Sequence, residues 1–383
     1  MIALTFFGCN LNSLITIKPM AKPILKQIPR INPRIRPSIS STRMVDIASA
    51  AGVSLMTVSR ALKPNTSVSA ATRARVLAVV KRLGYVPDSI AAGLAARRSG
   101  FVSLLMPSLN NSHFAETAMA IKETLEPHGL QLLLGHTNYQ TQFEERLVQT
   151  MLSRRPEAIV LTYDGHSPHT RALLKSAGIP VIDIWEIPTR PIGHAVGFSN
   201  RAASRALAQR LIEQGYRRIA YIGETHDEWT RGTLRRLGFI DAMAAAGLAF
   251  NRQIAQAPPP INMEQGGNAL AALLEKWPDT DAVMCVSDPC AYGVLIECQR
   301  RKIKVPNQLA IAGFGAFEIS ANCLPQLSTV QVCGRSLGLA TGQLLLKLLQ
   351  KNHPIEFNAN QKHQTVLIDA KPVIRGSTPS RIK

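Results

Sequence analysis

One stretch decides the fold of the first part of this chain: Met44-Val-Asp-Ile-Ala-Ser-Ala-Ala-Gly-Val-Ser-Leu-Met-Thr-Val-Ser-Arg-Ala-Leu62. Read with a period of 3.6 residues, its first half places four apolar side chains on one short helical face: Val45, Ile47, Ala48 and Ala51. Gly52-Val-Ser54 then interrupts the pattern. The first half therefore predicts a short helix that ends before Gly52.

The second half of the stretch predicts another helix. Ser54 is a suitable N-cap for a helix over residues 55–62, which would turn Val58, Ala61 and Leu62 inward. Two short helices joined by a tight turn containing glycine form the helix-turn-helix pattern. Taken alone, the same pattern also fits two packed helices of any small domain.

The residues that follow strengthen the DNA-binding interpretation. Ser69 caps a third predicted helix over residues 70–83, which carries four basic residues: Arg73, Arg75, Lys81 and Arg82. Gly84-Tyr-Val-Pro-Asp88 ends this helix, and a short Ala-rich helix over residues 89–98 follows, interrupted by Gly93. Isolated helices of that length are marginal in water, so we expect this one to need DNA and a partner chain for its order.

Residues Val45 to Gly100 resemble the DNA-binding headpiece and hinge of the lactose-repressor (LacI/GalR-type) family of transcriptional repressors. The motifs that carry the resemblance are Asp46-Ile-Ala, Ala51-Gly-Val-Ser, Thr57-Val-Ser-Arg60, Val68-Ser, Thr72-Arg, Arg75-Val and Leu83-Gly-Tyr-x-Pro87. The resemblance implies a headpiece over residues 43–87 and a hinge helix over residues 88–100. It also implies that the second helix enters the major groove with its first residues at base edges.

The resemblance assigns three side chains to base edges: Leu55, Met56 and Arg60. An arginine can bind guanine O6 and N7 in a bidentate manner, whereas Leu55 replaces a usually polar residue and offers apolar contact, as to a thymine methyl. Three hydroxyl groups are assigned to phosphates: those of Ser54, Thr57 and Ser59. For Arg60 the alternative is a solvated surface charge.

Leu94 lies at the position where paired leucines of a family dimer wedge into a central base step and kink the duplex. A plain interdomain linker is the alternative interpretation of residues 88–100.

Basic residues are concentrated in the first part of the chain. The whole chain has a formal charge of +19, and residues 1–100 hold fifteen Lys and Arg against two acids, Asp46 and Asp88. This asymmetry predicts a polyanionic partner. Double-stranded DNA is favoured over a membrane surface because the charges accompany a helix-turn-helix pattern. Residues 1–42 are expected to form a disordered basic arm, which either adds non-specific DNA affinity or reflects a misassigned translation start.

The cysteines and the apolar segments favour a cytoplasmic protein without a membrane span. Six cysteines show no C-x-x-C or zinc-finger spacing, namely Cys9, Cys285, Cys290, Cys298, Cys323 and Cys333. We expect buried free thiols rather than disulfides or metal ligands, and we expect no cofactor. No apolar run reaches the roughly 18 residues of a membrane helix, and Met1–Phe7 lacks the basic flank of a secretory signal.

From Phe101 onward, apolar strands alternate with amphipathic helices. Strands are predicted over residues 101–106, 130–134, 158–162, 181–184, 195–198, 218–222, 282–286 and 309–312. Helices are predicted over residues 113–128, 144–153, 169–177, 201–214, 231–246, 265–276 and 290–302. Such alternation indicates parallel sheets with crossover helices, and two sheets fit the length. A cleft between two such lobes, at the carboxyl ends of the strands, is the expected ligand site.

The family resemblance continues to about residue 378 and leaves a tail over residues 379–383. It is carried by Arg218-Ile-Ala-Tyr-Ile-Gly223, Arg236-Leu-Gly-Phe239, Ala310-Ile-Ala-Gly-Phe314 and Val373-Ile-Arg-Gly-Ser-Thr378, among others. It implies a two-lobed, periplasmic-binding-protein-like effector domain over residues 101–378 and a homodimer. Within the family the chain is most similar to the gluconate-operon repressor subgroup, on stretches such as Met106-Pro-Ser-Leu-Asn-Asn-Ser-His-Phe-Ala-Glu116 and Glu297-Cys-Gln-Arg300.

Four residues are candidates for effector binding: His113, Phe114, Arg235 and Asp288. Arg235 aligns with the family's effector-binding arginine, and its donors suit a sugar-acid carboxylate. Each candidate has an alternative: Arg236 competes with Arg235, His113 and Phe114 fit a packed helix start, and Asp288 fits an N-cap. Gly315 replaces a frequent hydroxyl-binding aspartate, which favours an anionic effector. Weaker candidates are Asp183, Trp185 and Glu186, while Arg146 fits either a pocket or a dimer contact.

The function predicted from the sequence is a DNA-binding transcriptional repressor controlled by a small sugar acid such as gluconate or ketogluconate. The alternative is a sugar-binding protein of the same two-lobed fold without a DNA role. An enzyme of doubly wound fold is disfavoured, because the chain has no G-x-G-x-x-G after a strand, no P-loop and no G-x-S-x-G elbow.

Overall fold

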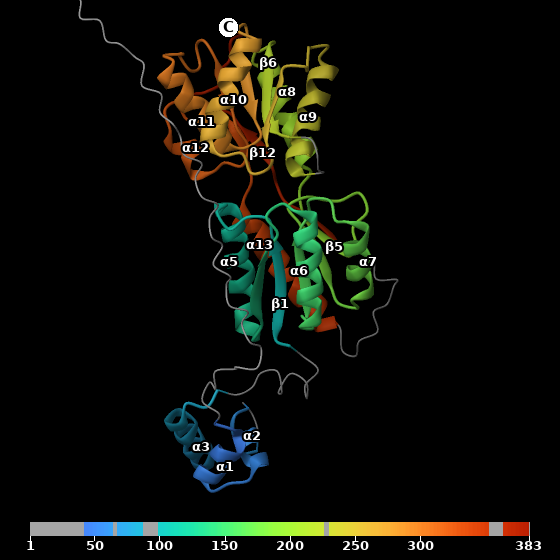
Figure 1. Ribbon diagram of the computed structural model, residues 1–383, viewed down its shortest axis with the longest axis vertical. Helices are drawn as coiled ribbons and strands as arrows, with labels where there is room; N and C mark the ends of the chain where they lie inside the picture. Colours follow the sequence, from blue (N-terminus) through green and yellow to red (C-terminus); the bar gives the residue numbers. More distant parts are fainter. Residues whose placement is uncertain (1–41, 64–66, 87–98, 226–229, 352–362, 383) are drawn as a thin grey trace, which may run out of the picture. The chain divides into compact units, whose positions relative to one another are not determined.

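The computed structural model describes residues 42–63, 67–86, 99–225, 230–351 and 363–382. The chain forms two compact units, Met1–Pro87 and Asp88–Lys383 (Figure 1). Three predictions lie outside the described residues: the basic arm up to residue 41, Cys9, and the hinge helix over residues 89–98 with Leu94.

The first unit contains three short helices, α1 (Met44–Ala51), α2 (Leu55–Ala61) and α3 (Ala70–Leu83). The side chain of Ser54 accepts a hydrogen bond from Thr57 N at 3.2 Å, and that of Ser69 accepts one from Thr72 N at 3.2 Å. These contacts confirm both predicted N-caps. Gly52 ends α1 with φ +61°, a left-handed conformation that favours glycine. The helix-turn-helix prediction is therefore confirmed.

The core of the first unit is small and apolar. It consists of Ile47, Ala48, Ala51, Val58, Ala61, Val76 and Val79. The prediction that Val45 belongs to this face is wrong, since Val45 is 54% exposed. Met44 packs against the core instead, because positions 44, 47, 48 and 51 form the i, i+3, i+4, i+7 stripe of a helix.

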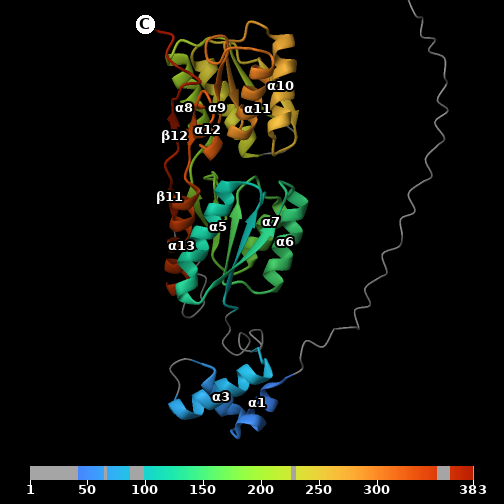
Figure 2. The same cartoon turned by 90° about the vertical axis from the view of Figure 1, so that its left-hand side faces the viewer.

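The second unit begins with a six-stranded parallel sheet in the order β11-β5-β4-β3-β1-β2. Its strands are β1 (Phe101–Met106), β2 (Gln131–His136), β3 (Ala158–Thr162), β4 (Val181–Ile184), β5 (His194–Gly197) and β11 (Thr365–Leu367). Helices α5 (Ser112–Leu125) and α13 (Gly334–Lys351) cover one face, while α6 (Thr141–Ser153) and α7 (Pro168–Ser176) cover the other (Figure 2). A 3-10 turn, Glu126–His128, follows α5. We call this assembly the first lobe.

The second lobe is built on a four-stranded parallel sheet in the order β7-β6-β8-β9. Its strands are β6 (Ile219–Glu224), β7 (Gln253–Ala257), β8 (Ala282–Cys285) and β9 (Ala310–Ala312). Helices α8 (Asn200–Glu213) and α9 (Arg231–Ala245) lie on one face, and α10 (Met263–Lys276) and α11 (Asp288–Arg300) lie on the other. The lobe also contains α12 (Glu318–Asn322) and an antiparallel pair, β10 (Thr329–Gln331) with β12 (Lys371–Val373).

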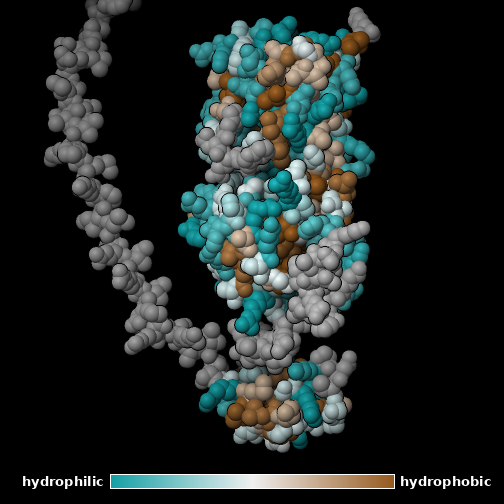
Figure 3. Space-filling model, turned by 90° about the vertical axis from the view of Figure 1, so that its right-hand side faces the viewer, coloured by the Kyte–Doolittle hydropathy of each residue, from teal (hydrophilic) through white to brown (hydrophobic). Residues whose placement is uncertain are grey.

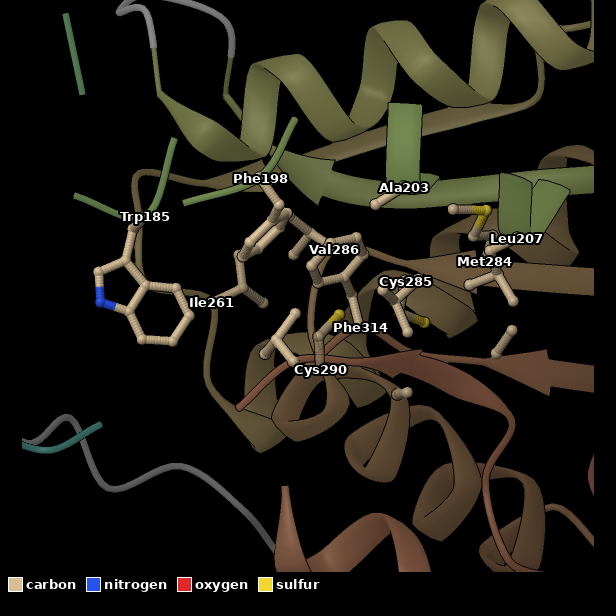
Figure 4. Close-up of a cluster of buried hydrophobic side chains, with 14 of the residues drawn as sticks. Trp185, Phe198, Ala203, Leu207, Ile261, Met284, Cys285, Val286, Cys290 and Phe314 are labelled. Atoms are coloured by element: carbon tan, nitrogen blue, oxygen red, sulfur yellow. The ribbon is translucent and has the colours of Figure 1, made fainter. Parts of the chain in front are cut away.

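The described chain passes between the lobes at residues 198–199, 332–333 and 368–370. Buried apolar residues of both lobes form one continuous cluster, part of which is drawn in Figure 4. In that view Trp185 lies at the edge of the cluster, beside Phe198 and Ile261. The rings of Phe198 and Phe314 stack with centroids 6.4 Å apart. This contact packs the crossing segment at Phe198 against the second lobe.

The predicted two-lobed fold with parallel sheets is confirmed, and the predicted strands and helices are present with ends shifted by up to three residues. The sequence pattern did not predict β7, α12, α13 or the three short strands β10, β11 and β12. The thiols of Cys285, Cys290, Cys298 and Cys323 are free and buried, but Cys333 is exposed, so its predicted burial is wrong. No helix in the described part of the chain is long and apolar enough to cross a membrane.

Glycine allows α13 to approach α5 closely, and this contact is testable. A Cβ atom at Gly338 would lie 2.5 Å from Thr117 O and 2.7 Å from Ala120 Cβ. Gly338→Ala should therefore lower the free energy of unfolding by about 1–3 kcal/mol through overpacking, although alanine favours helices. The matched control is Gly267→Ala within α10, where a Cβ meets nothing closer than 3.4 Å. Chemical denaturation of both variants would contradict this account if Gly338→Ala were as stable as Gly267→Ala.

Candidate functional site

The α2 helix presents the predicted DNA-contacting side chains to solvent. Leu55 and Met56 are 46% and 62% exposed, so both side chains are available for contact. Arg60 and Ser54 are also exposed, and Thr57 and Ser59 are partly exposed. The hydroxyl oxygens of Ser54 and Thr57 lie 2.9 Å apart. In the view of Figure 3, apolar residues gather on the surface of the helical unit.

The end of α2 is held by a basic residue of α3. Arg73 Nη1 donates hydrogen bonds to Ala61 O at 2.7 Å and to Lys63 O at 2.6 Å. Arg73 thus satisfies carbonyl groups that the end of α2 leaves unpaired. One of the four basic residues predicted on α3 therefore serves the fold of the headpiece.

The second unit contains a cavity of about 320 Å³ between the two lobes. Its lining comes from segments that follow the carboxyl ends of the parallel strands. From the first lobe these include Ser108 after β1, Tyr139 after β2, Asp164 after β3 and Trp185 after β4. From the second lobe they include Glu224 at the end of β6, Ile261 after β7, Ser287 after β8 and Phe314 after β9. The cleft predicted from the strand order is thus present, with a volume suited to a small ligand.

Aromatic rings form one part of this lining. Of the predicted site residues, His113 and Phe114 at the start of α5 both line the cavity and are buried. The ring of His113 lies edge-on to Phe317 with centroids 4.3 Å apart, and Phe114 lies edge-on to Trp185 at 5.4 Å. Burial lowers the pKa of His113, so its ring is neutral near pH 7. This wall offers flat apolar surfaces and a neutral imidazole.

Several buried nitrogen atoms of the lining have no hydrogen-bond partner among the described residues. They are Nδ1 and Nε2 of His113, Nε1 of Trp185 and Nη1 of Arg231. A buried donor without a partner costs about 1–3 kcal/mol. These atoms belong to side chains that line one cavity, which makes them candidates for contact with a bound ligand.

Arg235 lies in the cavity, as predicted, and is held firmly by its own lobe. Its Nε donates to Asn200 Oδ1 at 2.9 Å and its Nη1 donates to Val286 O at 2.8 Å. The guanidinium carbon lies 3.9 Å from the centre of the Phe314 ring. Burial, and next the like charge of Arg231, lower the pKa of Arg235. The competing candidate, Arg236, does not line the cavity.

The lining also contains a second arginine and two acids that no sequence motif indicates. Arg231, the first residue of α9, places Nη2 3.4 Å from Asp164 Oδ2 of the first lobe. Burial raises the pKa of Asp164 to about 6 against the opposing effect of Arg231. Burial also raises the pKa of Glu224, whose Oε2 accepts a hydrogen bond from Thr230 at 2.8 Å. The cavity lining therefore contains two arginines and two carboxyl groups, which is more acid than the sequence motifs predict.

Asp288 has a different place from that expected. Asp288 is fully buried and lies outside the cavity lining: its Oδ1 accepts from Thr329 Oγ1 at 2.6 Å and its Oδ2 accepts from Phe317 N at 2.8 Å. The alternative role of Asp288 as an N-cap is wrong, because the side chain of Ser287 caps α11. Gly315 does line the cavity, with φ +128°, and a Cβ there would lie 2.6 Å from the Phe317 ring. Phe317 thus occupies the space that a larger residue at position 315 would need.

Behind the cavity, His166 connects three segments of the first lobe. Its Nδ1 lies 2.7 Å from Glu144 Oε1 on α6, and its Nε2 lies 2.9 Å from Asp183 Oδ1 on β4. Burial alone would lower the pKa of His166, but the hydrogen bonds to Asp183 and Glu144 outweigh it and raise the pKa to about 10. Of the weaker candidates, Asp183 belongs to this cluster, Glu186 accepts hydrogen bonds from Asn200, and Trp185 lines the cavity. Arg146 lies over the Phe143 ring, outside the lining.

The His166 cluster gives the second unit a predictable pH dependence. A histidine whose pKa is raised by folding stabilises the fold below its unfolded pKa of about 6.5, and this contribution is lost as the pH rises through about 10. His166→Gln should lower the melting temperature at neutral pH and flatten its decline above neutral pH. His128→Gln is the matched control, since His128 is exposed. If the melting temperatures of wild type and His166→Gln changed in parallel with pH, the ion-paired imidazolium would be absent.

A helix-turn-helix unit followed by a two-lobed α/β unit with a small-ligand cavity is typical of ligand-responsive DNA-binding regulators. The comparisons with known proteins agree with this class. Residues 43–88 match the model for bacterial regulatory proteins of the lacI family, and residues 208–378 match that for a periplasmic binding protein-like domain.

Relatives of known family match most of the chain. The HTH-type transcriptional regulator GntR of Escherichia coli strain K12 is 33% identical over 79% of this chain and 90% of its own length. The regulator IdnR of the same strain is 32% identical over 80% of this chain and 92% of its own length. A solved LacI-family regulator from Silicibacter pomeroyi is 32% identical, with a TM-score of 0.81 over 88% of this chain and 99% of that one. The chain belongs to the LacI family and is a DNA-binding transcriptional regulator.

Proposed function

We propose that this protein is a homodimeric repressor whose binding to operator DNA is controlled by a small sugar acid. One observation supports the part of the proposal that concerns the effector. Two arginines, and side chains with buried, unpartnered nitrogen atoms, line one cavity at the carboxyl ends of the strands of two parallel sheets. The family membership supports the DNA-binding half and the dimer. A sugar-binding protein without a DNA role is disfavoured, because the helix-turn-helix unit has its own core and N-caps.

On the DNA side, Leu55, Met56 and Arg60 are proposed to meet base edges from the exposed face of α2. Ser54, Thr57 and Ser59 are proposed to contact phosphates, which position the protein without reading sequence. Leu94, which lies outside the described residues, remains the proposed minor-groove wedge of the hinge.

Arg60→Ala tests the base-reading assignment. Loss of one bidentate contact should cost about 1–3 kcal/mol of operator binding per half-site and relax selectivity, while effector binding stays intact. Gel shifts with the DNA flanking the protein's own gene and with scrambled DNA measure both effects. Arg210→Ala, an exposed arginine of α8 in the second unit, is the control. If Arg60→Ala still distinguished operator from scrambled DNA as well as wild type does, Arg60 would have no role in reading the DNA sequence.

On the effector side, the cavity combines charge, flat apolar rings and small size. Two arginines suit a carboxylate, the neutral His113 suits hydroxyl groups, and the rings of Phe114, Phe317 and Trp185 suit carbon faces. The absence of a carboxylate at Gly315 and the sequence resemblance to gluconate-operon repressors point in the same direction. Gluconate, ketogluconate or a related hexonate is the proposed ligand. The buried acids Asp164 and Glu224 suit its hydroxyl groups as acceptors.

Calorimetric titration with D-gluconate and D-glucose tests this effector class. Wild type should bind gluconate more tightly than glucose, and Arg235→Ala should weaken gluconate binding about 10- to 100-fold, the usual value of a charge-assisted hydrogen bond. Arg236→Ala is the control from outside the lining. Equal binding of both sugars by wild type would exclude a sugar acid, and normal gluconate binding by Arg235→Ala would exclude the role of that arginine.

A further inference from the structure

The two arginines of the cavity differ in what they have left to offer a ligand. Arg235 has already committed Nε and Nη1 to Asn200 and Val286, and its face lies on the Phe314 ring. All three partners belong to the second lobe, so Arg235 is fixed before any ligand arrives. Arg235 can donate from the rest of its guanidinium group, but it cannot turn toward a new anion.

Arg231 is much less committed. Its Nη1 is buried and has no hydrogen-bond partner as far as the described residues extend, and its side chain is only 7% exposed. Its Nη2 reaches Asp164 at 3.4 Å, longer than the roughly 2.7–2.9 Å of a strong charged hydrogen bond. The guanidinium carbon lies 5.2 Å from the centre of the Phe114 ring. A buried guanidinium whose ion pairing among the described residues is one long contact is able to accept a second anion.

The ion pair between Arg231 and Asp164 also connects the two lobes. Arg231 begins α9 in the second lobe, and Asp164 follows β3 in the first. Among the described residues, theirs is the ion pair that joins the two lobes directly. Arg231 N also lies 3.4 Å from Asp164 Oδ1. An anion bound by Arg231 is therefore held at the junction of both lobes.

We propose that Arg231 is the residue by which the cavity selects a negatively charged ligand, its unpartnered Nη1 binding the ligand's carboxylate while Asp164 retains Nη2. This inference rests on the proposed sugar-acid function and assigns its charge recognition. The carboxylate would then share one guanidinium with Asp164. Two neighbouring carboxylates disfavour double ionisation, so Asp164 takes up a proton when the ligand binds.

The surroundings of Asp164 favour this protonation. The charged or titratable side chains that act on it are Arg231, Glu224 and Glu144, and it in turn acts on Tyr139 and Tyr163. Burial raises the pKa of Asp164 to about 6 before any ligand is present. A bound carboxylate raises it further, so binding near pH 6 to 7 should consume protons.

The test compares D-gluconate with D-gluconamide, which keeps the carbon chain and hydroxyl groups but replaces the carboxylate by a neutral amide. Calorimetry on the full chain should show a preference of wild type for gluconate. Arg231→Gln should weaken gluconate binding about 10- to 100-fold and leave gluconamide within about twofold, so that the preference disappears. Arg236→Gln, on the same helix but outside the lining, should change neither affinity. Thermal unfolding verifies that each variant is folded.

A second measurement needs no change at Arg231. Titrations of wild type with gluconate in two buffers of different ionisation enthalpy should give different heats near pH 6, because Asp164 takes up a proton. Asp164→Asn should abolish that difference and bind gluconate at least as tightly, since a competing anion is gone. Equal heats for wild type in both buffers would contradict the proposal that Asp164 and the ligand's carboxylate share the guanidinium group of Arg231.

The outcomes separate this inference from the function on which it rests. If wild type binds gluconate no better than gluconamide, the sugar-acid function fails and the inference fails with it. If wild type prefers gluconate and Arg231→Gln keeps that preference, the function stands and the inference alone is wrong.

Discussion

Buried nitrogen atoms that lack partners are the constraint on which the effector unit depends. Trp185 and Arg231 line the cavity, and each has one buried nitrogen without a partner among the described residues, at a cost of about 1–3 kcal/mol apiece. Trp185 also has φ +73°, and Asn138 and Tyr139 have φ +53° and +58°, conformations that cost free energy in residues other than glycine. This cost is offset elsewhere, by the continuous apolar cluster of both lobes. A ligand that supplies acceptors removes part of the cost, and therefore stabilises the state that binds it.

The topology explains why the cavity could be located from the sequence. Parallel strands joined by right-handed crossovers bring every strand's carboxyl end to one edge of the sheet. His113 and Phe114 are predictable because they follow the first strand, and Arg235 because it aligns with the effector-binding arginine of the family that the chain resembles. The helix-turn-helix was equally predictable, because the glycine turn, the two serine caps and the apolar stripe are local features. Val45 was misassigned because the stripe begins one residue earlier, at Met44.

The remaining parts of the site depend on contacts between distant segments. Asp164 and Arg231 are 67 residues apart and belong to different lobes, so no local pattern marks them as a pair. Asp288 has a suitable position after β8, but its carboxylate turns toward Thr329 and Phe317, and Gly313 leaves the space for it. Strand β11 has three residues and pairs with β5, which lies about 170 residues earlier. Its length gives no periodicity to detect, and only the completed sheet supplies its partner.

Under the proposed function, a ligand in this cavity would alter DNA binding only through its different affinity for two arrangements of the lobes. The cavity lining supplies a physical basis for such a difference, because its acid and its less committed arginine come from opposite lobes. A movement of one lobe changes the distance between Arg231 and Asp164, and with it the electrostatic cost of placing a carboxylate between them. A neutral sugar of the same shape lacks that dependence, since its hydroxyl groups interact weakly with either charge. Under the proposed sugar-acid function, the charge of the ligand, rather than its size, would be the property that links occupancy of this cavity to the arrangement of the lobes.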